Sequence, residues 1–350
     1  MTNNSLPINE NKRIFWVDAL KGFAILTVIF LHSHNGQNTD GTVAGHIIKW
    51  ITSYHMTLFF ACAGFFFSLP STAEKVKHQI KNKCKTLLVP YLIWGVLIGF
   101  LVENGRLLIR TNASLNIASI IVKIVTARAS YLASWFLWVL LGVYCIQYVI
   151  AMAVKSSPIK EIIWIIANII MLPLGYLMLR FWGVGIYRIN LIIASCFFFT
   201  LGSVMRRFLA FLDQKRIVYR IILCFVAISV GGIICFINGL VTYSGAEFGN
   251  PLLHTISAMF TIFGLFLAFS LFYNKNLCNN AKKLLEYLGK NSIIVLLTHL
   301  ILLYGIRILE KLLGMKIHTF PGILAFLIIT IAELIIIKLI PKKVQWVFGR

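Results

Sequence analysis

Charged residues are scarce in this sequence, and acidic residues are the scarcest. Asp and Glu together number 11 in 350 residues, and all charged residues make up only 13%. A typical soluble domain is about 25% charged and about 45–50% apolar, whereas this chain is 59% hydrophobic with a mean hydropathy of +0.86. The composition therefore argues against a soluble enzyme or a disordered tail and indicates a polytopic membrane protein.

The sequence also lacks the short motifs of several common activities. It contains no P-loop, no dinucleotide-binding glycine fingerprint, no GxSxG elbow, no HExxH pair and no CxxC pair. Its seven cysteines lie in apolar runs or beside lysines, which does not suggest a disulfide framework. ATP hydrolysis, NAD chemistry, serine hydrolysis and zinc binding therefore have no motif behind them. We expect no bound cofactor and no metal.

Long apolar runs fill most of the chain, and a membrane-spanning helix needs about 20 such residues. We predict an all-α transmembrane bundle that forms one membrane domain over residues 1–350, with a short polar tail at 1–12 and one longer outer connection at 104–133 that has room for an interfacial helix. The ninth and tenth spans are the least clear, because they carry Arg307 and Glu333. The ten expected spans are 14–34, 51–69, 86–103, 134–153, 161–179, 190–206, 220–238, 254–273, 291–309 and 322–340.

The distribution of Lys and Arg predicts the orientation. With the N-terminus in the cytoplasm, 21 of the 33 basic residues fall in inner segments, nine in outer segments and three within spans. Basic residues gather on the cytoplasmic side of membrane proteins, so both termini are expected there. The net charge of +22 is then largely a topology signal, and we expect a membrane-lipid environment rather than a nucleic-acid partner.

Three polar residues of the first span are candidates for function: Asp18, Lys21 and His32. An ionised residue at the centre of a span costs roughly 2.5–3.5 kcal/mol, and such residues usually face a polar cavity. Lys21 and His32 are 11 residues apart, which places them on one helix face about 16 Å apart along the axis. The alternative is local: Lys21 pairs with Asp18 or extends to the inner interface, and His32 bonds a neighbouring carbonyl.

Other polar residues leave similar alternatives open. His299 is either a packing residue or a base, and His55 is either interfacial or part of an outer site. Glu333 needs a partner, either Lys338 or a residue on another helix. A run of five lysines before Pro90 suits either anionic lipid or a phosphorylated cytosolic ligand.

Six segments, taken in order, resemble the membrane acyltransferase-3 family, in particular its fucose 4-O-acetylase-like exopolysaccharide branch. The first contains the Lys-x10-His element, the second resembles the second-span signature, and the last resembles the Leu-Gly-Lys-x-Ser…His signature. In the second, Thr57 stands in place of a proline and Ala63 in place of a serine. The segments are 18–32 (DALKGFAILTVIFLH), 55–68 (HMTLFFACAGFFFS), 85–94 (KTLLVPYLIW), 135–141 (WFLWVLL), 197–207 (FFFTLGSVMRR) and 288–299 (LGKNSIIVLLTH).

The resemblance implies a ten-span, stand-alone acyltransferase of the bacterial inner membrane. It implies acetyl-CoA as donor and a saccharide or lipid-linked glycan as acceptor. His32 matches the essential histidine and Lys21 the essential basic residue. The family's Arg-x-x-Arg element has no Arg here, and the nearest substitutes, which we expect at the donor site, are Lys81, Lys83 and Lys85.

The chemistry agrees with this resemblance, because a neutral His can take the proton of a sugar hydroxyl at physiological pH. We expect Asp18, His55, His299, Arg188 and Glu333 to contribute to a polar cavity, and Tyr54, His55 and Arg188 to line an outer acceptor site. Two other functions remain open: a transporter or flippase for a glycan precursor, and an acyltransferase with a non-sugar acceptor.

Overall fold

The computed structural model describes residues 14–37, 39–109, 117–128, 133–273 and 278–350. These residues form helices and connections, with no strand among them, which confirms the all-α prediction. The expected tail at 1–12 lies outside the described residues. The α-helices are α1 Phe15–His34, α2 Val43–Gly64, α3 Ala73–Lys83, α4 Val89–Ile109, α5 Ile117–Val125, α6 Trp135–Ala153, α7 Lys160–Trp182, α8 Ile189–Leu212, α9 Ile217–Asn238, α10 Pro251–Tyr273, α11 Asn279–Lys290, α12 Ser292–Leu312 and α13 Gly322–Leu339, joined by a π-helical turn η1 Cys84–Leu88 and the 3-10 turns η2 Ile186–Arg188, η3 Tyr243–Gly245 and η4 Lys342–Phe348.

A long helix lies at each of the ten expected spans. Within the described residues, nine helical segments are long and apolar enough to cross a membrane, and α2 is the one expected span not among them. This helix begins at 43 rather than 51, because the Thr42 side chain accepts a hydrogen bond from the backbone N–H of Gly45 and caps it. The hydroxyls of Thr52, Ser53 and Thr57 donate to carbonyls three residues back, so these polar residues fit within the helix.

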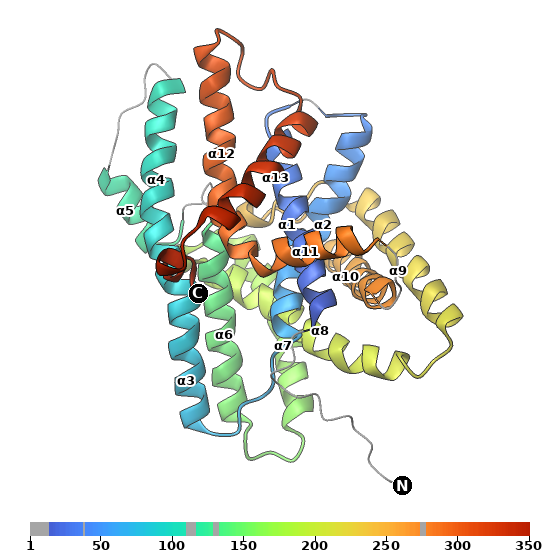
Figure 1. Ribbon diagram of the computed structural model, residues 1–350. Helices are drawn as coiled ribbons and strands as arrows, with labels where there is room; N and C mark the ends of the chain where they lie inside the picture. The colour runs from blue at the N-terminus through green and yellow to red at the C-terminus, as the bar shows by residue number, and fades with distance from the viewer. Residues whose placement is uncertain (1–13, 38, 110–116, 129–132, 274–277) are drawn as a thin grey trace.

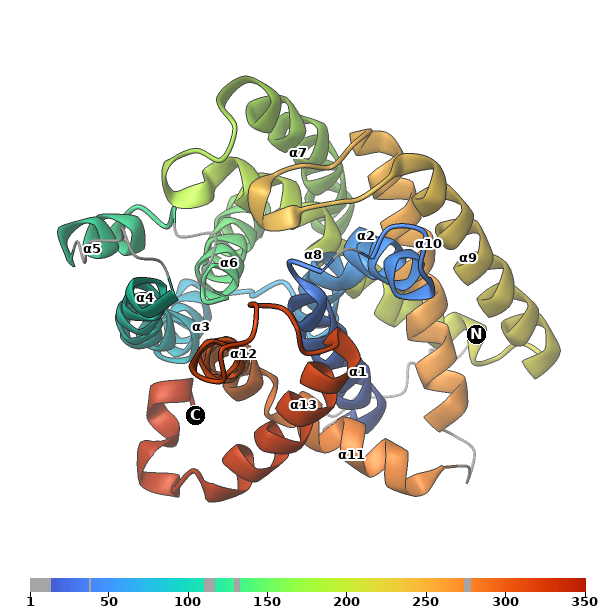
Figure 2. The ribbon, with the colours of Figure 1, turned by 90° about the horizontal axis from the view of Figure 1, so that it is seen from above.

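Helix α1 lies near the middle of the bundle. It contacts α2, α10, α11, α12 and α13, and the view from above shows these helices around it (Figure 2). By contrast, α7 and α9 lie at the periphery and expose most of their apolar side chains, as lipid-facing helices do. The central helix is therefore the one that carries both Lys21 and His32.

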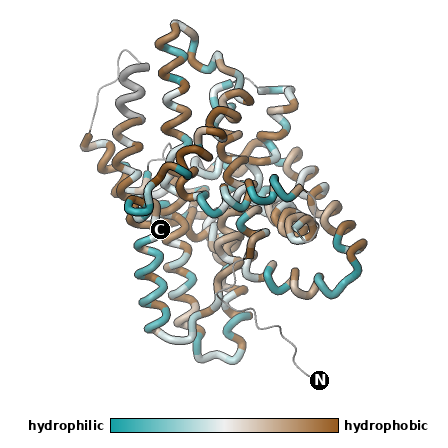
Figure 3. The backbone as a smooth tube through the Cα atoms, in the orientation of Figure 1, coloured by the Kyte–Doolittle hydropathy of each residue, from teal (hydrophilic) through white to brown (hydrophobic). Residues whose placement is uncertain are grey.

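Hydrophilic segments gather on one side of the molecule. They include α3, the α6–α7 connection and the α8–α9 connection, all in the lower part of the view, and α11, which lies across the bundle (Figures 1 and 3). These segments contain basic residues that the charge distribution assigns to the inner side. The orientation with both termini in the cytoplasm stays a prediction from that distribution.

Two glycines bring α11 directly onto α1. A Cβ atom on Gly289 would lie 1.7 Å from the carbonyl oxygen of Asp18, and one on Gly22 would lie 1.9 Å from the carbonyl oxygen of Leu285. Only glycine allows two helix backbones to approach this closely. The segments 18–32 and 288–299, far apart in sequence, therefore meet at this crossing.

A second glycine crossing joins α2 to α8. A Cβ on Gly64 would lie 1.7 Å from the carbonyl oxygen of Phe199, and one on Gly202 would lie 1.9 Å from that of Ala61. The crossing brings together the segments 55–68 and 197–207. Four of the six segments singled out in the sequence thus carry backbone-to-backbone contacts.

The charged residues of α12 and α13 have local partners. Arg307 is 4% exposed and donates to the carboxylate of Glu310 at 3.1 Å, and this carboxylate also accepts from the backbone N–H groups of His318 and Phe320. Glu333 is fully buried and accepts from the hydroxyl of Thr298 on α12 at 2.8 Å. The partner of Glu333 is thus a residue on another helix, and these hydrogen bonds allow both helices to bury polar side chains.

Candidate active site

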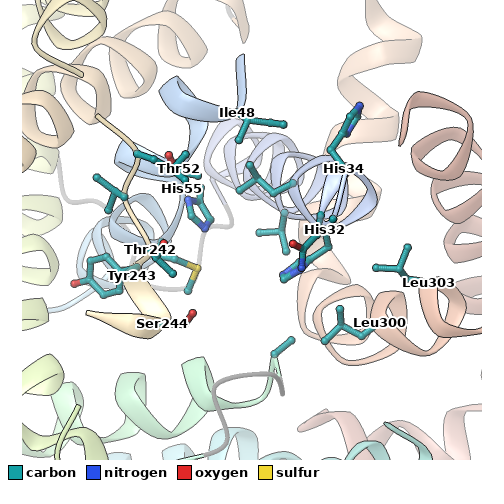
Figure 4. Close-up of a pocket in the computed structure, with 18 of the residues that line it drawn as sticks. His32, His34, Ile48, Thr52, His55, Thr242, Tyr243, Ser244, Leu300 and Leu303 are labelled. Carbon is teal, nitrogen blue, oxygen red and sulfur yellow. The ribbon is translucent and has the colours of Figure 1, made fainter. Parts of the chain in front are cut away.

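A cavity of about 480 Å³ opens around the C-terminal end of α1. Its walls come from α1, α2, α12, the start of α6 and the connection between α9 and α10 (Figure 4). Three histidines lie among its polar residues. The polar and aromatic lining residues are His32, His34, Asn35, Gln37, Thr39, Thr52, His55, Trp135, Thr242, Tyr243, Ser244 and Tyr304.

His32 and His55 lie on facing walls of this cavity. Their half-buried imidazoles come from α1 and α2, and Figure 4 shows both rings directed inward. The Nδ1 atom of His55 lies 3.1 Å from the carbonyl oxygen of Ile51. Because a carbonyl only accepts, Nδ1 carries the hydrogen and leaves Nε2 as an acceptor toward the cavity.

The imidazole of His299 lies beside that of His32, with 5.2 Å between the ring centroids. His299 is 1% exposed and is not part of the cavity lining. Its Nδ1 lies 2.8 Å from the carbonyl oxygen of Val295. The sequence predicted His299 at a polar cavity, and the structure places it directly behind His32.

Arg188 supports the cavity from behind rather than lining it. Its buried guanidinium donates to the carbonyls of Ala127 at 2.6 Å and Ser244 at 2.9 Å, and lies over the Trp135 ring at 5.2 Å. Ser244 and Trp135 both line the cavity. Of the residues expected at an outer acceptor site, the structure therefore puts His55 on the cavity surface and Arg188 behind its wall.

The connection between α9 and α10 contributes a wall that the sequence did not reveal. Tyr243 is buried, and its hydroxyl lies 2.8 Å from that of Ser195 and shares a hydrogen bond with it. Burial raises the pKa of the Tyr243 phenol above its ordinary value, so this group stays neutral. No motif marks Tyr243 or Ser244, because they reach the cavity only through the fold.

A second pocket, of about 250 Å³, lies near the other end of α1. Following the predicted orientation, we call it the inner pocket and the histidine-lined cavity the outer cavity. Lys21 pairs with Asp18 at 3.6 Å, is 26% exposed, and lies over the Phe66 ring at 5.1 Å from its centroid. Phe66 lines this second pocket together with Lys83, whose Nζ lies 4.1 Å from the centroid of the Tyr144 ring. Both lysines are thus within cation–π distance of aromatic rings at this pocket.

The structure separates the three lysines predicted at a donor site. Only Lys83 lines the pocket, whereas Lys81 and Lys85 are exposed and lie outside it. The π-helical turn η1 follows Lys83 directly and joins α3 to α4 in one continuous helical stretch. Because a π turn holds more residues than an α turn, it shifts which lysines face inward relative to α4. The sequence, with no sign of this turn, did not fix that register.

A narrow void of about 30 Å³ lies beside the histidine-lined cavity. It shares Met56 and Leu296 with the outer cavity. It also touches Ile25, which follows Lys21 by one helical turn, or about 6 Å. The void thus borders the cavity at His32 and comes within one helical turn of Lys21 along α1.

The remaining predicted residues lie apart from the cavity surface. Asp18 is buried and pairs with Lys21, Glu333 is buried against Thr298, and Tyr54 is buried against Trp50. Among the residues that the structure describes, no group of three or more His, Cys, Asp or Glu side chains is placed to hold a metal ion.

Together, the helical bundle, the histidine-lined cavity and the inner pocket define a multi-pass membrane protein with a site along its central helix. A family model described as an acyltransferase domain matches residues 14–339, nearly the whole chain. The protein therefore belongs to the membrane acyltransferase-3 family. No curated protein and no solved structure gives a significant match to this chain.

Proposed function

We propose that this membrane acyltransferase moves an acetyl group from acetyl-CoA to a hydroxyl of a cell-surface saccharide or its lipid-linked precursor, in the bacterial inner membrane. The observation that supports it most is the arrangement on α1. His32 opens into a cavity of about 480 Å³ at one end of this helix, and Lys21 adjoins a pocket lined by Lys83 toward the other end.

The reaction follows from the chemistry of these groups. His32 takes the proton of the acceptor hydroxyl as the oxygen attacks the thioester carbonyl. A carbon–oxygen bond forms, and the tetrahedral intermediate then collapses with cleavage of the carbon–sulfur bond. The proton on His32 passes to the departing thiolate, which restores the neutral imidazole.

The outer cavity suits a saccharide acceptor. Its volume falls within the range of small-molecule sites, which combine apolar and aromatic walls with a few polar groups. Trp135 and Tyr243 supply aromatic surface, while Thr52, His55 and Ser244 supply hydrogen-bonding groups. The non-sugar acceptor stays a second possibility of the same enzyme class.

The inner pocket suits the nucleotide end of the donor. Lys83 lines it, and an adjoining pocket of about 550 Å³, which shares Ser68 and Gln79 with it, is lined by Glu74, Lys75 and His78. The ammonium groups of Lys83 and Lys75 would meet the phosphates of acetyl-CoA there. The Lys21–His32 separation of about 16 Å along the helix is comparable with an extended pantetheine arm, which has to displace the side chains at the narrow void.

The test is the O-acetyl content of isolated surface polysaccharide, measured by NMR in cells with wild type, H32A, or no protein. We expect acetyl signals only with wild type. The matched control is H46A, because His46 is also on α2 near the same end of the bundle but lies outside the cavity. Equal signals in wild type and H32A would remove His32 as the base. No signal in any strain, with the protein stably expressed, would refute a saccharide acceptor.

A further inference from the structure

The imidazole of His299 has one satisfied nitrogen and one buried nitrogen without a partner. Its Nδ1 lies 2.8 Å from the Val295 carbonyl oxygen, which can only accept, so Nδ1 carries the hydrogen. Its Nε2 is therefore an acceptor, and it has no hydrogen-bond partner among the described residues. A buried polar atom without a hydrogen-bond partner destabilises the fold, so its position calls for an explanation.

The neighbour that can supply a donor is His32. The two ring centroids are 5.2 Å apart, with 43° between the ring planes. His32 is half-buried at the cavity edge, and rotation about its terminal side-chain torsion has a broad energy minimum. A modest turn of the His32 ring thus directs one of its N–H groups at Nε2 of His299. Catalytic hydrogen bonds are often long in empty sites and shorten once substrate binds.

A hydrogen bond to α13 holds the part of α12 that carries His299. Thr298, its neighbour on α12, donates to the buried carboxylate of Glu333 on α13 at 2.8 Å. Leu296 and Leu300 of the same helix line the cavity, while His299 does not. His299 therefore faces His32 rather than a ligand in the cavity.

We propose that His299 is a positioning residue for His32, an inference that rests on the acyltransferase function proposed above. Nε2 of His299 accepts the N–H of His32, which leaves the other nitrogen of His32 unprotonated toward the acceptor hydroxyl. When His32 takes the hydroxyl proton it becomes an imidazolium, and the same hydrogen bond stabilises it until the proton passes to the thiolate. This is the role of a third group that orients a catalytic base, here filled by a neutral imidazole.

Two amide variants separate this role from simple packing. In H299Q the side-chain oxygen reaches the place of Nε2 and accepts from His32, but the bond to Val295 is lost. In H299N the amide nitrogen takes the place of Nδ1 and keeps the bond to Val295, but nothing accepts from His32. H299F removes both interactions. All three variants are compared with wild type in lipid nanodiscs. The assay measures the release of free thiol from acetyl-CoA. The acceptor is polysaccharide isolated from cells that lack this protein.

We expect H299Q to keep kcat within about threefold of wild type, and H299N and H299F to lose at least about tenfold in kcat. The KM for acetyl-CoA should stay unchanged in all three. If His299 has only a structural role, the bond to Val295 matters most, and H299N should then have a higher kcat than H299Q. That result would overturn the inference. Equal kcat in H299N, H299Q and wild type would overturn it as well. A wild-type protein that releases no thiol with this acceptor contradicts the proposed function itself, which keeps the two failures distinct.

Discussion

Gly289 offers a sharp test of the crossing between α1 and α11. A Cβ at this position would lie 1.7 Å from the Asp18 carbonyl oxygen, and ordinary contact begins near 3.4 Å. The helices would have to separate by roughly 1.7 Å, because both groups belong to the backbone and no rotamer change relieves the overlap. Overpacking of this kind costs about 1–3 kcal/mol, so G289A should lower the free energy of unfolding by that amount.

Gly305 provides the matched control. It also lies within a helix, α12, and a Cβ there would meet nothing within 4 Å. Replacing a helical glycine with alanine in open space stabilises by about 0.5–1 kcal/mol. The two single-methyl changes should therefore shift stability in opposite directions, by roughly 1.5–4 kcal/mol in total.

The assay is thermal unfolding of the purified protein in detergent, followed by tryptophan fluorescence. We expect G289A to melt below wild type and G305A at or above it. The added methyl group would also push against Asp18, which pairs with Lys21. Because we expect Lys21 to contact the donor, G289A should also weaken acetyl-CoA binding. If the melting temperature of G289A equals or exceeds that of wild type, the two backbones do not approach this closely. The steric requirement for glycine at position 289 would then not hold.

Three further predictions concern charged side chains. K83A should weaken acetyl-CoA binding, measured by calorimetry in nanodiscs, whereas K81A should not, because of these two lysines only Lys83 lines the inner pocket. Equal losses of affinity in the two variants would indicate a general charge effect. K21A should also bind acetyl-CoA poorly, and unchanged binding would contradict a donor placed along α1. Arg307→Met should cost about 3–5 kcal/mol, because it leaves the carboxylate of Glu310 buried without its cation; an unchanged melting temperature would show that the backbone donors to Glu310 are sufficient.

Much of the architecture could be predicted from the sequence, because apolar runs of span length dominate it. The exceptions have local causes. Helix α2 begins eight residues early, since the Thr42 cap and hydroxyl bonds to backbone carbonyls place polar residues in the helix. The third span continues back through η1 into α3, so the lysine-rich segment before the expected span is helical as well. Both effects depend on side-chain hydrogen bonds or backbone register, which hydropathy does not measure.

The site was predictable only where polar residues interrupt apolar helices. His32 and His55 line the cavity, and both were visible as such interruptions. The pairing of His299 with His32 depends on how α1 and α12 pack, and the wall at Tyr243 and Ser244 depends on a connection between distant helices. Spacing along one helix carries no information on contacts of this kind.

The π-helical turn at Cys84–Leu88 has a consequence for insertions and deletions. An α-helical residue advances the helix by about 100°, so removal of one residue from this turn would restore an α-helix and rotate α3 by about that angle relative to α4. Lys83 would then turn away from Tyr144 with no side chain replaced. The charge presented at the inner pocket thus depends on chain length as well as on residue identity, and a single-codon deletion here would act like a change of specificity.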